Sequence, residues 1–70
     1  LMVLSKVDGY LAKGYIDVYF SRYAKAEINY KKAHEIGNSK TTFDKLYDLY
    51  LNKLKDKAKA NKVKEQFENK

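Results

Sequence analysis

The chain has 70 residues, with 15 basic against nine acidic side chains, a net charge of +6, 44% hydrophobic residues, and no cysteine or proline. This length allows one small domain, and so much hydrophobic material excludes a disordered tail. The lack of cysteine excludes a disulfide framework and a thiolate metal site, and no apolar run approaches the roughly 18 to 20 residues that span a bilayer.

The chain opens with the short apolar run LMVL, which has no basic leader, so we expect no signal peptide. The absence of cysteine fits a reducing compartment, and we therefore expect a cytoplasmic (intracellular) location. Because the first residue is not methionine, we interpret residues 1–70 as a single small helical domain or as a fragment of a longer helical array.

The first helix is predicted over residues 5–20. Ser5 with Asp8 three residues later matches a capping box, and apolar residues then recur at helical spacing. Gly14 lies inside this segment, where a glycine costs about 1 kcal/mol relative to alanine. We interpret Gly14 as a point at which another helix approaches closely. The apolar stripe consists of Val7, Leu11, Tyr15 and Val18.

The segment around residues 20–22 allows two interpretations. One apolar stripe continues through it with a mean step of about 3.6 residues, the period of an unbroken helix over residues 5–36. A second face, which carries Val18, meets only polar residues beyond this point. That ending is typical of a turn between two helices, over 5–20 and 22–36.

The sequence GNSKTT marks a clear break between helices. Gly37 followed by Asn38 predicts a helix end at which the glycine adopts the left-handed conformation. Thr41 with Asp44 repeats the capping pattern, and this predicts a helix start and a helix over residues 41–54.

The apolar pattern loses its phase after Leu54 and resumes on another side of the helix. A phase slip of this kind marks a turn, and Asp56 is the candidate cap of a last helix over residues 57–69. The pattern as a whole predicts an all-α fold of antiparallel helix–turn–helix units.

Between Tyr10 and Ala33, aromatic residues alternate with small ones at helical spacing, so that small residues bring two helices close and aromatic rings fill the remaining space. This pattern resembles the tetratricopeptide repeat, a helix–turn–helix unit of roughly 34 residues, most closely over residues 23–37. Two features depart from the family: Lys13 stands where leucine is usual, and residues 20–22 lack the expected glycine or aspartate. The helix-packing residues that the resemblance implies are Tyr10, Gly14, Tyr23, Ala26, Tyr30 and Ala33.

A looser second copy follows. The matching residues are Phe43, Leu46 and Tyr50 in its first helix and Ala60, Val63 and Phe67 in its second. This copy needs one extra residue in its turn, and Phe67 stands where a small residue is usual. The terminal unit of a helical array is often atypical in this way.

The resemblance implies a protein–protein interaction module that binds a peptide or a partner helix through a helical-repeat surface. In such arrays the groove is lined chiefly by the first helix of each unit. The partner-binding candidates that follow from this analogy are Tyr15, Asp17, Tyr47 and Asn52.

The alternative fold is a two-helix hairpin that dimerises into a four-helix bundle. Such a homo-oligomer would be structural, and its basic helix would contact an anionic surface, either nucleic acid or membrane, through Lys53, Lys55, Lys59 and Lys62. These lysines flank a narrow apolar line and the chain has a single arginine, so we expect a solvated face and neither sequence-specific nucleic-acid binding nor membrane binding. The segment YAKAEINYKK also resembles the core helix of F-BAR domains, which are far longer.

We expect no enzyme activity and no catalytic, metal-binding or cofactor-binding residue. His34 is the single histidine and has no carboxylate or cysteine arranged as a partner, so we expect it to lie at the surface or partly buried near a helix end. Asp44 and Asp48 share a helix face, but they are typical of a solvated helix start. The chain has no glycine-rich phosphate loop and no activated serine.

Overall fold

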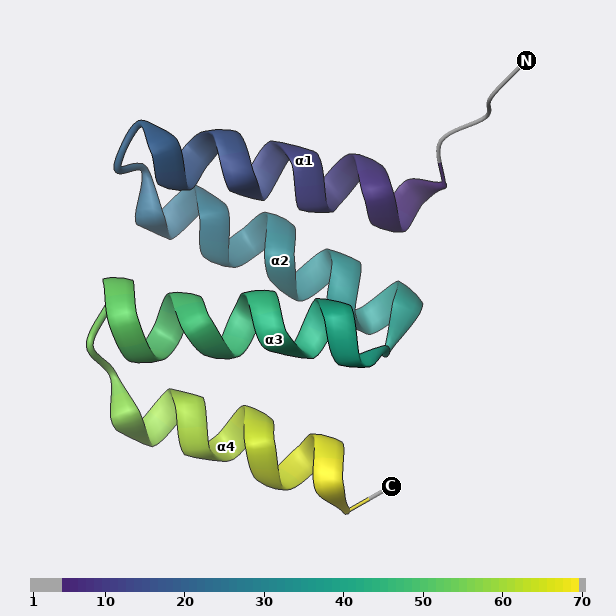
Figure 1. Ribbon diagram of the computed structural model, residues 1–70, viewed down its shortest axis with the longest axis vertical. Coiled ribbons are helices and arrows are strands. Elements are labelled where there is room, and N and C mark those ends of the chain that lie inside the picture. The colour runs from purple at the N-terminus through teal and green to yellow at the C-terminus, as the bar shows by residue number, and fades with distance from the viewer. Residues whose placement is uncertain (1–4, 70) are drawn as a thin grey trace.

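The computed structural model describes residues 5–69, in which helices are stacked side by side in chain order (Figure 1). The helices are α1 (Lys6–Tyr19), α2 (Tyr23–Gly37), α3 (Lys40–Asp48), which continues as a π-helical stretch η1 (Leu49–Lys53), and α4 (Lys57–Glu68). Neighbouring helices run antiparallel and form a slab of 40 × 31 × 13 Å. The predicted all-α fold class is confirmed, and residues 5–69 contain no strand.

The connection between α1 and α2 decides between the two interpretations of residues 20–22. Ser21 has a φ of 60°, in the left-handed region, so a right-handed helix cannot continue through it. The Ser21 amide donates to the Val18 carbonyl at 2.9 Å, and the Arg22 amide donates to the Asp17 carbonyl at 2.7 Å. These bonds close α1. An unbroken helix over residues 5–36 is therefore wrong, and so is the two-helix hairpin that requires it.

Two of the predicted helix caps are confirmed. The Ser5 hydroxyl accepts a hydrogen bond from the Asp8 amide at 3.1 Å, and the Asp56 carboxylate accepts one from the Lys59 amide at 3.1 Å. Each bond satisfies an amide that has no partner inside its own helix. These caps place the starts of α1 and α4 where the sequence predicts them.

The start of α3 differs from the prediction. Ser39, not Thr41, is the N-cap: its hydroxyl accepts from the Thr42 amide at 3.2 Å, and the Thr42 hydroxyl accepts from the Ser39 amide at 3.0 Å. Ser39 has the extended backbone that a cap requires, with φ −111° and ψ 169°, whereas Thr41 already lies in the first helical turn. The capping box predicted for Thr41 and Asp44 is therefore wrong.

The end of α2 also differs in detail. Asn38 adopts the left-handed conformation, with φ 48° and ψ 44°, while Gly37 stays in the helix. Asparagine tolerates this conformation better than most residues, so the helix ends one residue later than predicted. A Cβ placed on Gly37 would lie 3.1 Å from a methyl group of Val7, so the lack of a side chain at Gly37 lets the end of α2 lie close to α1.

Equivalent helices of the two pairs begin with a period of 34 residues: α1 begins at Lys6 and α3 at Lys40, while α2 begins at Tyr23 and α4 at Lys57. The left-handed residue of each connection, Ser21 or Lys55, follows the same period. Both connections span three residues, so the extra residue predicted in the second turn is wrong. The third helix holds no extra residue either, because α1 has 14 residues and α3 (nine) together with η1 (five) also has 14.

Small residues bring α1 and α2 together. A Cβ placed on Gly14 would lie 2.5 Å from Cδ1 of Tyr30, much closer than any carbon–carbon contact allows. Ala26 and Ala33, on the same helix as Tyr30, are fully buried. The close approach predicted at Gly14 is therefore confirmed, and the tyrosine ring fills the space that the glycine leaves open.

Most of the remaining predicted packing residues lie in or against the core, and Tyr10 is the exception. The buried core cluster consists of Ala26, Tyr30, Leu46, Leu49, Tyr50, Ala60 and Val63. Tyr23 and Phe43 are partly buried against this cluster. Tyr10 is half-buried outside it, and the ammonium groups of Lys13 and Lys32 each lie 5.6 Å from the centre of its ring.

Candidate functional site

The four residues predicted to bind a partner do not form one site. Tyr15 is exposed on α1 and lines a hollow of about 150 Å³ between α1 and α3. Asp17, Tyr47 and Asn52 are not among the residues that line it. Tyr47 is half-buried beside Phe43, with ring centroids 5.4 Å apart, and the side-chain amide of Asn52 donates to the Asp48 carboxylate.

Asp17 is buried, and its carboxylate is bound within the chain. The Arg22 guanidinium donates to one carboxylate oxygen at 3.2 Å, and the Asn29 amide donates to the other at 2.8 Å. These bonds tie the end of α1 and the connection after it to α2. Asp17 therefore stabilises the first helix pair, and both of its carboxylate oxygens already accept hydrogen bonds within the chain.

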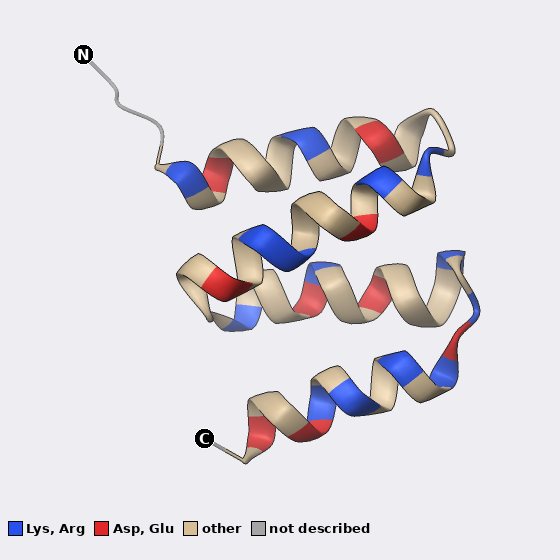
Figure 2. Cartoon of the chain, turned by 180° about the vertical axis from the view of Figure 1, so that it is seen from behind, with Lys and Arg blue, Asp and Glu red and all other residues tan. Residues whose placement is uncertain are grey.

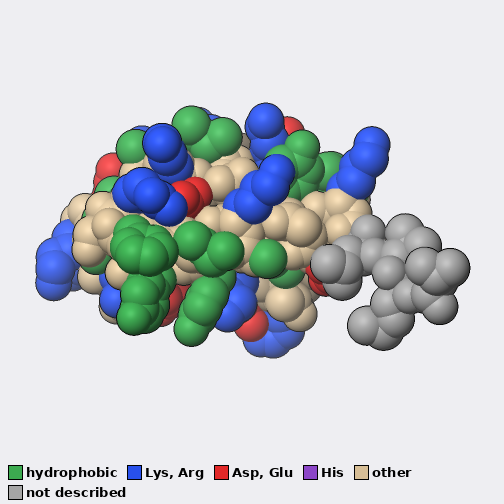
Figure 3. All heavy atoms as spheres, turned by 90° about the horizontal axis from the view of Figure 1, so that it is seen from above, with side chains coloured by type: hydrophobic (Ala, Val, Ile, Leu, Met, Phe, Trp, Pro, Cys, Tyr) green, Lys and Arg blue, Asp and Glu red, His purple; other side chains and the backbone are tan. Residues whose placement is uncertain are grey.

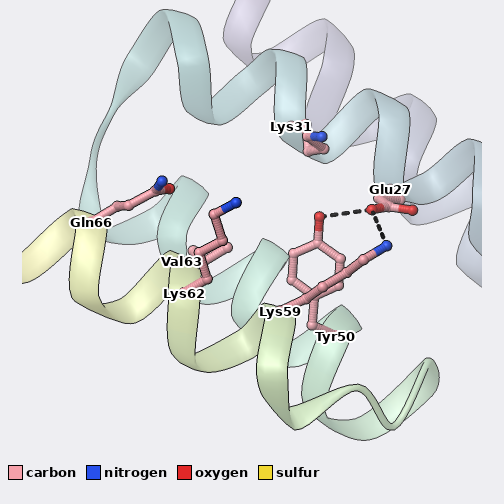
Figure 4. A pocket seen from close by; sticks show the side chains of 7 residues that line it. All are labelled: Glu27, Lys31, Tyr50, Lys59, Lys62, Val63 and Gln66. Atoms are coloured by element: carbon pink, nitrogen blue, oxygen red, sulfur yellow. Dashed lines mark hydrogen bonds and ion pairs between the residues drawn. The ribbon is translucent and has the colours of Figure 1, made fainter.

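A hollow lies between α2 and α4, with α3 beneath it (Figure 4). It measures about 280 Å³ and adjoins a second hollow of about 130 Å³. The two share Lys31, Tyr50, Val63 and Gln66, so they form one groove, which we call the α2–α4 groove. The other lining residues are Glu27, Lys59 and Lys62 in the larger hollow and His34, Glu35 and Leu46 in the smaller.

The floor of the groove is apolar and its walls are polar. Leu46, Tyr50 and Val63 are buried and belong to the core, so their inner sides are fixed by packing. Lys31 lies on the α2 wall, and Lys62 lies on the α4 wall opposite (Figure 4). The groove therefore has apolar side chains at its base and charged or amide side chains along its sides.

A hydrogen-bonded group closes one end of the groove. The Tyr50 hydroxyl donates to Oε2 of Glu27 at 2.8 Å, and the Lys59 ammonium lies 3.4 Å from the same oxygen (Figure 4). Burial, together with the hydrogen bond to Glu27, raises the pKa of Tyr50 well above its ordinary value. Because these residues come from three different helices, the contact fixes α2, α3 and α4 relative to one another.

Basic residues recur along both helices that form the walls (Figure 2). Of the four lysines predicted to contact an anionic surface, Lys59 and Lys62 line the groove. Lys53 lines the separate hollow beside Tyr15, and Lys55 is the left-handed residue of the second connection. The four lysines therefore do not line one groove.

Sequence reasoning missed Lys31 and Gln66 as members of this site. Gln66 lies one turn beyond Lys62 on the same helix, so the helical spacing of α4 was a usable signal. Lys31 is on α2, and no local pattern in the sequence indicates that it lies across from α4. Its place in the groove follows only from the packing of the two helix pairs.

A second surface feature is an apolar patch at the end of α1. The patch consists of Tyr15, Ile16, Tyr19 and Phe20, whose exposed fractions range from 48% to 76%. The Tyr19 and Phe20 rings meet edge to face with centroids 5.1 Å apart. Figure 3 shows hydrophobic side chains gathered at the end of the molecule opposite the grey residues. This patch lies on the first helix pair, away from α4.

His34 and the acidic residues of α3 make structural contacts. His34 is half-buried near the end of α2, as expected, with Nδ1 2.8 Å from the Thr42 hydroxyl. Asp44 pairs with Lys40 at 3.7 Å. Over the part of the chain that the structure describes, no three His, Cys, Asp or Glu side chains are grouped so that they could hold a metal ion.

A scan against protein-family models, a search of curated proteins and a search of solved structures found no match to this chain. Among residues 5–69, no helix combines the length and the apolar character needed to cross a bilayer. The chemistry of the α2–α4 groove therefore has to be inferred from its own residues.

Proposed function

We propose that this chain is a protein–protein interaction module that binds a peptide segment or a partner helix in the α2–α4 groove. The observation that carries the proposal is the groove itself, which runs between two helices over a fixed apolar floor of Leu46, Tyr50 and Val63. A groove of this composition suits an amphipathic segment whose apolar side chains lie on the floor while its polar side chains meet the walls.

The helical-repeat architecture supports the same proposal. Both helix pairs start 34 residues apart, which is the length of a tetratricopeptide repeat, and the first pair has small residues where its helices meet. Each pair alone is too small to bury its apolar face, so the pairs stack, and stacking creates long furrows between helices. The α2–α4 groove is one of these furrows.

A second candidate function is self-association through the patch on α1. The patch leaves four large side chains exposed on one helix, whereas the outward residues of α4 are mostly lysine, glutamate and asparagine. Two copies that meet α1 against α1 would bury the patch in a closed dimer. Sedimentation of the wild-type chain and of a Tyr19→Ser variant separates a dimer from a monomer that binds other proteins.

Selection from an unbiased peptide library, followed by NMR mapping, tests the proposed function. We expect selected peptides to perturb the amide signals of Lys31, Lys62 and Gln66 more than those of α1. Gln66→Trp should weaken binding of the selected peptides by about tenfold or more, because the indole fills the groove. Gln66 is exposed, so the change costs little stability.

Asn61→Trp is the matched control, since Asn61 is also exposed on α4 but lies outside both hollows. It should bind the selected peptides as tightly as the wild-type chain does. Peptides that perturb α1 instead, or that bind Gln66→Trp unchanged, would contradict a function in the α2–α4 groove.

A further inference from the structure

The charges around the larger hollow are unbalanced. Three lysine ammonium groups, of Lys31, Lys59 and Lys62, line it together with a single carboxylate, that of Glu27. Glu27 is already bound by the Tyr50 hydroxyl and the Lys59 ammonium. Within residues 5–69 no carboxylate lies within ion-pair distance of Lys31 or Lys62, so their two charges are uncompensated.

The smaller hollow does not cancel this excess. Its lining includes Glu35, which is exposed on α2 one turn beyond Lys31, together with His34 and Gln66. The positive charge is therefore centred where Lys31 and Lys62 line the walls, beside the buried Tyr50 and Val63. A concave surface with low-dielectric walls concentrates the field of such charges and attracts ions of opposite sign.

From this arrangement we infer that the α2–α4 groove binds an acidic segment of a partner protein. Carboxylates of the segment pair with Lys31 and Lys62, and an apolar side chain between them lies on Leu46, Tyr50 and Val63. The inference rests on the proposed function and adds the chemistry of the partner. Its basis is charge complementarity: the walls supply two unpaired cations, and the floor supplies an apolar surface.

The same residues favour an acidic peptide over nucleic acid or membrane. A phosphate backbone needs a continuous row of cations, but Glu27 and Glu35 lie along the α2 wall on either side of Lys31. The lysines that would extend the row, Lys53 and Lys55, lie outside the groove. The apolar floor also has no role in holding phosphates, whereas it accommodates an aliphatic side chain.

The test uses three synthetic peptides of equal length that share one central leucine. The flanking residues are glutamate and aspartate in the first, glutamine and asparagine in the second, and lysine in the third. We expect the acidic peptide to bind the wild-type chain about tenfold more tightly than the neutral one, with the lysine peptide weakest. The preference should shrink as salt is raised, because the charges at the groove rim are partly screened.

Two double variants locate the effect. Lys31→Gln with Lys62→Gln should abolish the preference for the acidic peptide. Lys57→Gln with Lys64→Gln removes the same net charge from exposed positions of α4 outside both hollows and should retain it. The inference is overturned if both double variants lose the preference equally, or if single-stranded DNA or anionic vesicles compete as well as the acidic peptide does. The chain would then bind polyanions in general.

The outcomes also separate this inference from the proposed function. Equal binding of the neutral and acidic peptides, with NMR perturbations at Lys62 and Gln66, would overturn the acidic preference and leave the peptide-binding function standing. Failure of all three peptides, and of the library-selected peptides, to perturb these residues would overturn both. Tighter binding of the acidic peptide, lost only in the Lys31 and Lys62 variant, supports both.

Discussion

The pairs α1–α2 and α3–α4 have the same helix starts, 34 residues apart, but they fill the space between helices differently. In the first pair, Gly14 lies against Tyr30, and Ala33 is fully buried. In the second, Phe67 stands 34 residues after Ala33, and its ring stacks on Phe43 with centroids 4.6 Å apart. The comparison teaches that equal helix boundaries do not determine packing, because the size of the contacting side chains sets it.

The outward faces of the two pairs differ as well. Ile28 on α2 is 55% exposed, and the residue 34 positions later, on α4, is Lys62 in the wall of the groove. Equivalent positions thus carry an apolar residue in one pair and a cation in the other. The second pair supplies the basic wall, and the first pair supplies Glu27 and Lys31 opposite it.

The largest expected change in stability follows from replacing the glycines of α1 with alanine, and it tests how the first pair is packed. Gly14→Ala places a methyl group against the Tyr30 ring, whereas Gly9→Ala meets no atom within 4 Å. Both changes gain about 1 kcal/mol of helix propensity, so the difference between them isolates the clash. We expect the Gly14 variant to be less stable than the Gly9 variant by about 1–3 kcal/mol in urea denaturation.

Gly9→Ala is itself the control and should raise the free energy of unfolding above that of the wild-type chain. If both variants gain stability equally, then α1 and α2 do not meet at Gly14.

A smaller effect is expected at high pH from the two buried tyrosines. Burial raises the pKa of Tyr30, with Asp48 adding to it, and burial with the Glu27 hydrogen bond raises that of Tyr50. The unfolded chain therefore loses these protons first, near pH 10, so their contribution to stability is present below about pH 10 and is lost as the pH rises above it. The wild-type chain should therefore lose stability as the pH rises above about 10, and Tyr50→Phe should reduce this loss of stability more than Tyr30→Phe does.

Denaturant titrations at about pH 8 and about pH 11 measure this difference, and lysine titration cancels when each variant is compared with the wild-type chain. At the lower pH, Tyr50→Phe should still cost about 1 kcal/mol, because it removes the hydrogen bond to Glu27. If the wild-type chain and the two variants lose the same stability between these pH values, neither tyrosine hydroxyl is buried against a neighbouring helix.

Helix boundaries could be predicted because they depend on local signals. Ser5 and Asp56 cap helices with bonds to amides three residues away, so the sequence alone contains both partners. Errors of one or two residues arose where two residues suited to the same role lie within two positions of each other, as Gly37 and Asn38 do at a helix end and Ser39 and Thr41 do at a helix start. The π-helical stretch Leu49–Lys53 has no comparable local signature in the sequence.

The candidate site was harder to predict because it depends on contacts between the pairs. Lys59 and Lys62 were recognised as cations, but Lys31 joins them only through the packing of α2 beside α4. Asp17 was assigned to a partner surface by analogy, and its burial against Arg22 and Asn29 follows from the geometry of the first connection. The sequence therefore indicated which residues carry charge, whereas it did not indicate which of them lie together in space.

The central claim is that the chain forms two helix pairs, each with a left-handed residue in its connection. Backbone NMR tests it most directly, through secondary chemical shifts over all residues and the couplings that report φ. We predict helical shifts that are interrupted at residues 20–22 and 54–56, with positive φ at Ser21 and Lys55. Continuous helical shifts through either segment would contradict the account, because the pair concerned would then be one long helix and the α2–α4 groove would not exist.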